Sequence, residues 1–125
     1  MKRSLTISQP KDLQRTRRAI MGLATELGFS RLELTKLLNA SVELTQDVLD
    51  RNSQATVSIE KTSYLGRVGI RLTLEESLPK GNNNKVIESY ERREPIHAVR
   101  QIVDQFEFKP ISENEFKISI TIWQE

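Results

Sequence analysis

Two carboxylates that could act together, Glu43 and Asp47, lie four residues apart in a segment with helical periodicity. Side chains at this spacing project from the same side of a helix. Such a pair can hold a hard cation such as Mg²⁺ or act on a water molecule as a general base. Asn39, Gln46 and Asp50 continue the same polar stripe. The alternative is that the stripe is only the solvated side of an amphipathic helix, which is typical of most such patterns.

The helix that would carry these carboxylates has clear end signals. Ser30 and Glu33 have the spacing of a capping box, which predicts a helix that begins at Ser30 and ends near Asn52. An earlier helix is predicted to begin near Pro10 and to end at Gly28, because glycine readily adopts the left-handed conformation of a helix stop. The positions predicted to face the core are Leu13, Thr16, Ile20, Leu23, Ala24 and Leu27 in the first helix, and Leu34, Leu37, Leu38, Ser41, Leu44, Val48 and Leu49 in the second.

Alternating apolar and polar residues predict strands in the rest of the chain. A hairpin turn is expected at Tyr64-Leu65-Gly66, and Pro95 suits the first turn of a third helix. Only a weak helical turn is expected within the irregular residues 76–93. The predicted strands cover residues 4–8, 54–60, 67–75, 106–111 and 116–123, and the stripe of the third helix is Ile96, Val99, Ile102, Val103 and Phe106.

The resulting element order is β-α-α-β-β-(loop)-α-β-β. This order predicts an α+β fold, a two-layer sandwich in which helices cover one face of a mixed or antiparallel sheet. The length of 125 residues fits a single domain over residues 1–125.

The composition excludes several classes of functional site. The chain has no Cys and one His, which rules out thiolate chemistry and most His-based metal centres. It has only five Gly, whereas phosphate-binding loops need several closely spaced glycines. No apolar run reaches the ~18–20 residues that a membrane span needs. We therefore expect a soluble, cytoplasmic protein without membrane contact.

The net charge of +2 is unevenly distributed along the chain. Residues 1–31 carry seven basic and two acidic side chains. Arg15 and Arg18 could contact an acidic partner, or the basic end could be the solvated face of a helix. Nucleic-acid binding is disfavoured, because the segment lacks the interleaved aromatic or glycine residues of such modules.

Two further residues have both a functional and a structural interpretation. Trp123 falls on the strand face opposite Ile118, Ile120 and Ile122. There it could be an exposed anchor for a partner, or it could pack on the first strand. His97 could titrate or accept a phosphoryl group, but without a neighbouring base a structural role is favoured.

Several segments, in this order, resemble a known family. The first two are Thr25-Glu26-Leu27-Gly28-Phe29 and residues 34–47, and the match continues through residues 68–76, 97–106 and the final hairpin. They resemble the serine-kinase anti-sigma factors, which belong to the histidine-kinase-like (GHKL) ATPase superfamily. In that family the second helix carries a Glu and, four residues later, an Asn that binds Mg²⁺ with ATP. Glu43 matches this Glu, and Asp47 stands in place of the Asn.

If the chain is an active kinase, the resemblance implies a role for each of three residues. Glu43 would be the base or the metal-positioning residue, Asp47 the Mg²⁺ ligand and Glu75 the reader of the adenine amino group. ATP and Mg²⁺ would then be the cofactors of a serine/threonine protein kinase.

The nucleotide motifs of the family are nevertheless altered in this chain. Glu75 and Glu76 stand where the family has an Asp-x-Gly-x-Gly turn, and residues 88–95, in place of a Gly-rich segment, contain three Glu and no Gly. The resemblance therefore implies a scaffold without ATP-dependent activity and without a cofactor. The chain would be a regulatory protein-binding module with a degenerate, mobile lid over residues 76–94. It would act by partner switching on a sigma factor or a STAS-type antagonist, with a possible homodimer.

Overall fold

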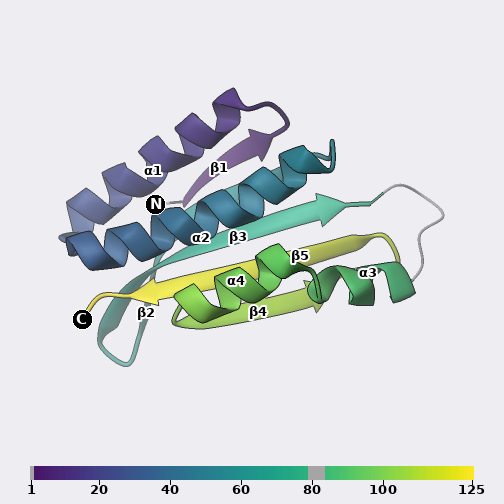
Figure 1. Cartoon of the computed structure of the whole chain (residues 1–125). Helices are drawn as coiled ribbons and strands as arrows, with labels where there is room; N and C mark the ends of the chain where they lie inside the picture. Colours follow the sequence, from purple (N-terminus) through teal and green to yellow (C-terminus); the bar gives the residue numbers. More distant parts are fainter. Residues whose placement is uncertain (1, 79–83) are drawn as a thin grey trace.

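The strands and helices assemble around one sheet (Figure 1). The structure, a computed structural model, describes residues 2–78 and 84–125. Pro79, Gly81, Asn82 and Asn83, which carry most of the predicted loop signals, lie outside the described residues. The elements are β1 (Lys2–Ile7), α1 (Lys11–Leu27), α2 (Arg31–Asp50), β2 (Ala55–Tyr64), β3 (Arg67–Ser77), α3 (Asn84–Glu91), α4 (Glu94–Ile102), β4 (Gln105–Pro110) and β5 (Glu115–Trp123).

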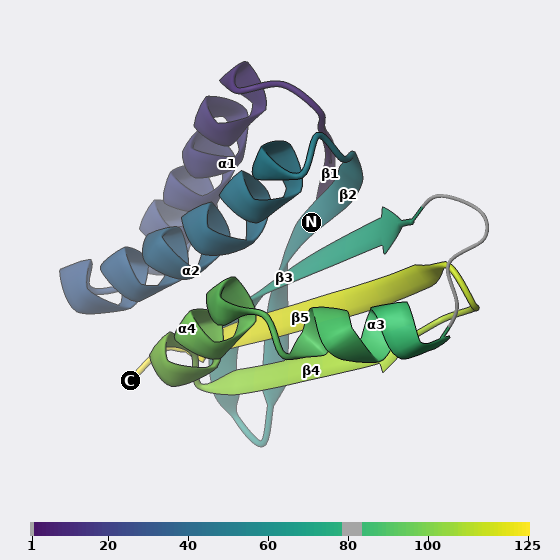
Figure 2. The same ribbon diagram turned by 45° about the vertical axis from the view of Figure 1, so that its right-hand side comes forward.

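The strand order in the sheet is β1-β2-β3-β5-β4, and all neighbouring strands are antiparallel. In the described part of the chain, four helices accompany this sheet, and they lie on one of its faces (Figure 2). The predicted α+β class is therefore confirmed, with an antiparallel sheet in an arrangement compatible with a two-layer sandwich.

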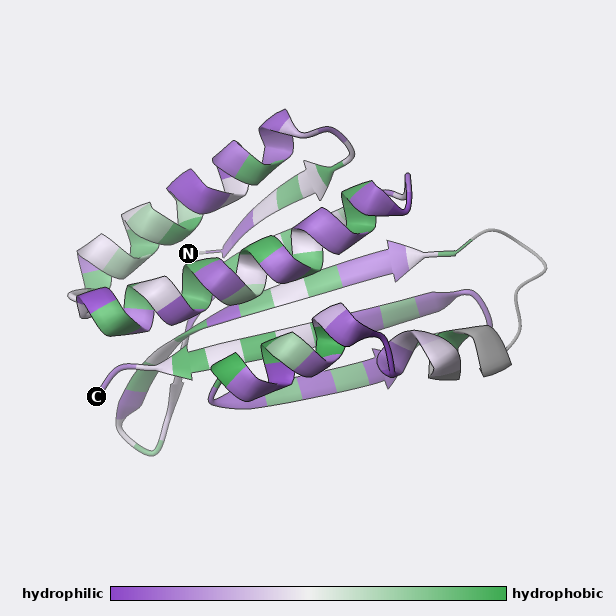
Figure 3. Cartoon of the chain, viewed as in Figure 1, coloured by the Kyte–Doolittle hydropathy of each residue, from purple (hydrophilic) through white to green (hydrophobic). Residues whose placement is uncertain are grey.

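The core lies between the helices and the alternating apolar residues of the strands. On β5, Phe116, Ile118, Ile120 and Ile122 are all buried, as their spacing predicts. Figure 3 shows the corresponding apolar and polar bands along the strands. Within the described residues, no helix combines the length and apolar character that crossing a bilayer requires.

The ends of the first two helices follow the predicted local signals. Gly28 ends α1 in the left-handed conformation with φ 73°. The Ser30 hydroxyl accepts a hydrogen bond from the backbone N–H of Glu33 at 3.1 Å, and the Glu33 carboxylate accepts one from the backbone N–H of Ser30 at 2.7 Å. The capping box is thus confirmed, and α2 ends at Asp50, close to the predicted Asn52.

The structure corrects the prediction in the segment before the third predicted helix. Instead of one weak turn, residues 84–91 form the eight-residue helix α3. Its local signals are weak, but Ile87 and Tyr90 are buried in the core, so tertiary packing stabilises it. The following helix, α4, ends at Ile102, and Phe106 lies on β4 opposite Ile120 instead of extending the helical stripe.

A buried carboxylate fixes the connection between β1 and α1. Asp12 is only 5% exposed, and its Oδ2 accepts hydrogen bonds from the backbone N–H groups of Ser8 at 3.0 Å and Gln9 at 2.9 Å. These hydrogen bonds, first that from Ser8, hold the pKa of Asp12 below its ordinary value of 3.8. The lowered pKa means that the ionised carboxylate stabilises the folded state.

We expect Asp12→Ala to lower the free energy of unfolding by about 1 kcal/mol at pH 7, because two backbone donors lose their acceptor. The lowered pKa makes this contribution present above pH 3.8 and lost as the pH falls through the folded-state value. Urea unfolding at a series of pH values should therefore show the wild-type and Ala curves converging in acid. Glu113→Ala, at an exposed position in the turn before β5, is the control. If wild type and Asp12→Ala differed by the same free energy of unfolding at all pH values, the stabilising role of the ionised Asp12 carboxylate would be contradicted.

Candidate functional site

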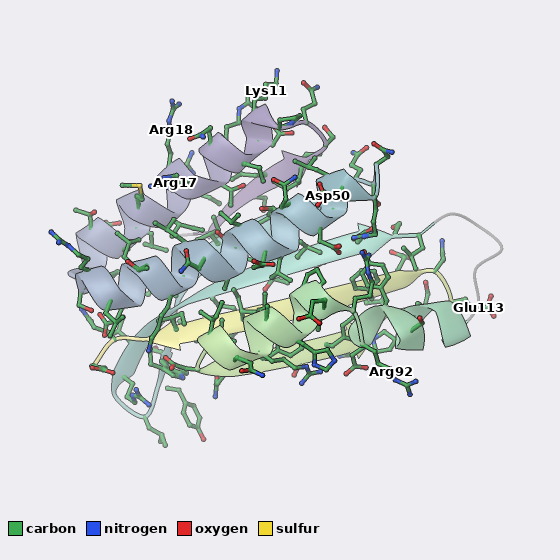
Figure 4. The ribbon with its side chains drawn as sticks, in the orientation of Figure 1. Lys11, Arg17, Arg18, Asp50, Arg92 and Glu113 are labelled. Carbon is green, nitrogen blue, oxygen red and sulfur yellow. The ribbon has the colours of Figure 1, made fainter. Side chains whose placement is uncertain are left out.

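The structure places the two carboxylates of the predicted stripe in different environments. Glu43 is exposed, whereas Asp47, one turn later on α2, is only 6% exposed. The other polar residues of the stripe, Asn39, Gln46 and Asp50, are exposed, and Figure 4 labels Asp50 near the end of the helix. The solvated interpretation therefore holds for the stripe except at Asp47.

Asp47 is surrounded by donors from three parts of the chain. Its Oδ2 accepts hydrogen bonds from Arg51 Nε and from the Tyr90 hydroxyl, both at 3.1 Å. Its Oδ1 lies 2.9 Å from Arg93 Nη2. Arg51 is the residue that follows α2, Tyr90 lies on α3, and Arg93 precedes α4. Both oxygens of Asp47 thus already have cationic partners.

Arg51 also binds a second buried carboxylate, that of Glu76 near the end of β3. Its Nη1 donates to Glu76 Oε2 at 2.6 Å and its Nη2 to Oε1 at 2.7 Å. The Ser53 hydroxyl donates to Glu76 Oε2 at 2.6 Å. The Glu76 side chain has no exposed surface. A bidentate guanidinium–carboxylate pair of this kind is among the strongest hydrogen-bonded pairs in proteins.

The ring of Tyr90 completes the cluster. The guanidinium carbons of Arg51 and Arg93 lie 4.3 Å and 5.1 Å from its centroid. The same ring contacts Phe116, with 4.7 Å between centroids, and Phe116 stacks on Phe108 at 5.2 Å. Cation–π contacts therefore join the charged groups to the aromatic core. We call Asp47, Arg51, Ser53, Glu76, Tyr90 and Arg93 the Arg51 network.

The Arg51 network is electrically balanced, with two carboxylates and two guanidiniums. Over residues 2–78 and 84–125, wherever side chains are described, no buried side-chain nitrogen or oxygen lacks a hydrogen-bond partner. Nor does any group of three or more His, Cys, Asp or Glu among those residues have an arrangement that could hold a metal ion. The network can join elements together, but it presents no open carboxylate for a cation.

Glu75 is not brought together with Glu43 and Asp47. It is the neighbour of Glu76 on β3, so it points to the opposite face of the sheet. There it borders a polar hollow of about 620 Å³ on the face without helices. The lining includes Ser58, Glu60, Arg71, Thr73, Lys117 and Ser119. Of the two adjacent glutamates, the structure thus connects Glu76, and not the predicted Glu75, to Asp47.

The residues predicted to contact a partner also differ in accessibility. Arg15 and Arg18 are exposed on α1, although Arg15 lies 3.8 Å from Asp12. Trp123 does lie on the face opposite Ile118 and its neighbours, but it is only 6% exposed. His97 is exposed on α4.

The burial of Trp123 depends on a glycine in the neighbouring strand. Gly69 lies opposite Trp123, and a Cβ at Gly69 would be 2.7 Å from the indole. The Arg67 guanidinium carbon lies 5.5 Å from the ring centroid. Two strands separate β5 from β1. Trp123 is therefore neither an exposed anchor nor packed on the first strand, and both interpretations of it are corrected.

Arg51, Tyr90 and Arg93 were not among the residues predicted to form a site. The spacing of four between Asp47 and Arg51 was a usable signal for an ion pair on one helix. The alternation Leu72-Leu74-Glu76 also placed Glu76 on the core face of β3. No local signal in the sequence connects Asp47 or Arg51 to Tyr90 or Arg93.

Comparison with protein-family models and with curated proteins finds no match for this chain.

We expect Arg51→Met to lower the free energy of unfolding by about 3–5 kcal/mol, because it leaves the buried Glu76 carboxylate without its cation. Arg51→Met combined with Glu76→Met should recover at least half of that loss, since the uncompensated charge is removed with its partner. Arg92→Met, at an exposed position between α3 and α4 (Figure 4), is the matched control. Urea unfolding measures these four proteins and Glu76→Met alone; additive effects of the two Met substitutions at Arg51 and Glu76 would contradict the pairing.

Proposed function

We propose that this chain is a regulatory protein-binding module on a GHKL-like scaffold, that it has no ATP-dependent activity, and that it acts by partner switching. Its order of elements and its resemblance to serine-kinase anti-sigma factors support this scaffold. The resemblance suggests a sigma factor or a STAS-type antagonist as the partner class. The Arg51 network is the observation that carries the proposal.

The Arg51 network joins the three elements that surround the nucleotide in the family. Asp47 lies on the helix that corresponds to the Mg²⁺-binding helix, and Glu76 lies at the end of the strand that precedes the adenine-binding turn. Tyr90 and Arg93 come from the segment that corresponds to the lid. Here these side chains bind one another directly. A nucleotide would have to displace Arg51 and leave two carboxylates facing its phosphates, which is electrostatically unfavourable.

The exposed surface of α1 offers a contact area for the partner. Lys11, Arg15, Arg17 and Arg18 are all exposed in the first half of the helix, and Figure 4 shows Lys11, Arg17 and Arg18 along it. Cations in the first turn are disfavoured by the helix dipole, so Lys11 does not serve the stability of the helix. An acidic surface on the partner would complement this cluster.

We expect no saturable binding of Mg-ATP, because the cationic groups of the Arg51 network are already paired. Isothermal titration and thermal denaturation of the wild-type chain should show neither binding heat nor a shift in melting temperature at millimolar Mg-ATP. A ligand at 100 times its Kd would stabilise the fold by about 2.7 kcal/mol, which such a scan detects easily. Saturable micromolar binding that Asp47→Ala abolishes would instead contradict the degenerate site and favour the alternative of an active kinase.

We expect Arg15→Glu combined with Arg18→Glu to weaken partner binding at least tenfold, since like charges would then face an acidic surface. The measurement is a pull-down from the native host, followed by titration of the purified partner against both forms of the chain. Arg92→Glu combined with Lys109→Glu, two exposed sites elsewhere, is the control with equal charge change. The proposal is supported if a sigma factor or STAS-type protein is recovered with the wild type and the control variant but not with the α1 variant. Equal recovery with both variants would exclude α1 as the contact area.

A further inference from the structure

The hairpin that joins β2 and β3 extends beyond the rest of the sheet. Among the residues that the structure describes, β1 pairs with β2 as far as Glu60, and β5 pairs with β3 from Gly69 onward. In the described part of the chain, residues 61–64 therefore pair only with residues 67–70 of β3. The contact with the end of β5 begins at Val68, whose carbonyl oxygen accepts a hydrogen bond from the backbone N–H of Gln124. We call residues 61–68 the hairpin arm. Figures 1 and 2 show the arm projecting beyond the other strands.

The tip of the hairpin arm exposes two large side chains next to each other. Leu65 is 84% exposed and Tyr64 is 63% exposed, the two highest values among the large hydrophobic residues described. A single exposed apolar residue is ordinary, but an adjacent aromatic and aliphatic pair at the end of a projecting arm is the kind of feature that binds in a pocket.

The backbone at the tip is unfavourable for the residue that occupies it. Leu65 has φ 50° and Gly66 has φ 82°, so both central residues of this two-residue turn are left-handed. Asn, Asp and Gly suit the first of these positions, whereas a leucine there is strained. The substitution Leu65→Asn would relieve the strain and remove the exposed apolar surface. The turn therefore has a leucine where local stability favours a polar residue, and this points to a role outside the fold.

The base of the hairpin arm is anchored, so the tip is held in a defined direction. Gly69 lies against the buried indole of Trp123, and the guanidinium of Arg67 lies over the same ring. Four antiparallel residue pairs, from Lys61–Ile70 to Tyr64–Arg67, continue the ladder to the turn. A rigid tip loses little conformational entropy on binding.

The hairpin arm is also positively charged. Lys61 and Arg67 are exposed, and residues 61–68 contain no acidic side chain. Within the described part of the chain, neither Lys61 nor Arg67 forms an ion pair. A complementary surface would therefore have an apolar pocket for Leu65 and Tyr64 with carboxylates at its rim.

We propose that the hairpin arm is a docking element for a protein partner whose surface has an apolar pocket rimmed by acidic side chains. This inference rests on the proposed function, since it names a contact site on the same regulatory module. A membrane is the less suitable occupant, because even a whole myristoyl chain gives only marginal membrane binding. Leu65 and Tyr64 together offer less apolar surface than that.

The test uses a photo-crosslinking phenylalanine derivative in place of Tyr64, introduced into the full chain in its native host. We expect it to capture a protein that the same substitution at Glu113 does not. Excess wild-type chain should compete for this capture, whereas Leu65→Asn should need at least tenfold more protein to compete equally. Thermal denaturation of Leu65→Asn should show an unchanged or higher melting temperature, so that weaker competition cannot be attributed to unfolding.

Several outcomes would overturn the inference. These are equal competition by Leu65→Asn, capture from both positions alike, or no captured protein at Tyr64. Tighter binding of the wild-type chain than of Leu65→Asn to vesicles of phosphatidylglycerol and phosphatidylcholine, with no protein captured, would assign the arm to membranes. Any of the first three outcomes, together with a partner that still binds through α1, would end this inference and leave the proposed function intact. Saturable Mg-ATP binding would instead end the proposed function, whatever the capture result.

Discussion

The carboxylate of Glu76 has no exposed surface, and a buried charge of this kind must have a partner of opposite sign. Arg51 supplies it through two short hydrogen bonds. Because the same guanidinium also binds Asp47 and lies on the ring of Tyr90, one side chain joins the end of α2, the end of β3 and helix α3. The arrangement of these three elements therefore depends on a single ion-pair network.

The same network gives Asp47 a structural role that differs from a role in nucleotide binding. A site for a metal–nucleotide complex must present carboxylate oxygens to the metal and donors to the phosphates. Here Arg51 and Arg93 occupy both oxygens of Asp47, and the donors that a phosphate would need are bound to carboxylates. The positive and negative groups are thus present in equal numbers, but they satisfy one another. This balance leaves the network with no unpaired carboxylate for a metal and no unpaired guanidinium for a phosphate.

Features that depend on local sequence were predictable, and features that depend on distant contacts were not. The stop at Gly28, the capping box of Ser30 and Glu33, and the strand ending at Trp123 each follow from a few neighbouring residues. By contrast, 25 residues separate Arg51 from Glu76, and 43 separate Asp47 from Tyr90. Helix α3 has weak local signals because it is stabilised by burial of Ile87 and Tyr90.

The predicted nucleotide site and the environment of Trp123 likewise depended on contacts that strand alternation cannot predict. The alternation along β3 could have shown that Glu76, and not Glu75, faces the helices, because Leu72 and Leu74 share its face. It could not show that Arg51 covers Glu76. Likewise, the pattern of β5 placed Trp123 on the opposite face, but its burial depends on the missing side chain of Gly69 in the adjacent strand. Strand periodicity gives the direction of a side chain and not what lies beside it.

Strand β3 connects two regions of opposite character, and this difference bears on how the proposed partner switching would work. Arg67, at one end, is in the hairpin arm with no ion pair among the described residues, whereas Glu76, roughly 30 Å away along the strand, is fully paired. A switch that works through the Arg51 network would need a second arrangement of two buried carboxylates, and each would be costly to leave unpaired. A switch at the exposed surfaces needs no such rearrangement. For the proposed partner switching, competition for the preformed surfaces of α1 and the hairpin arm would therefore have a lower energetic cost than rearrangement of the Arg51 network.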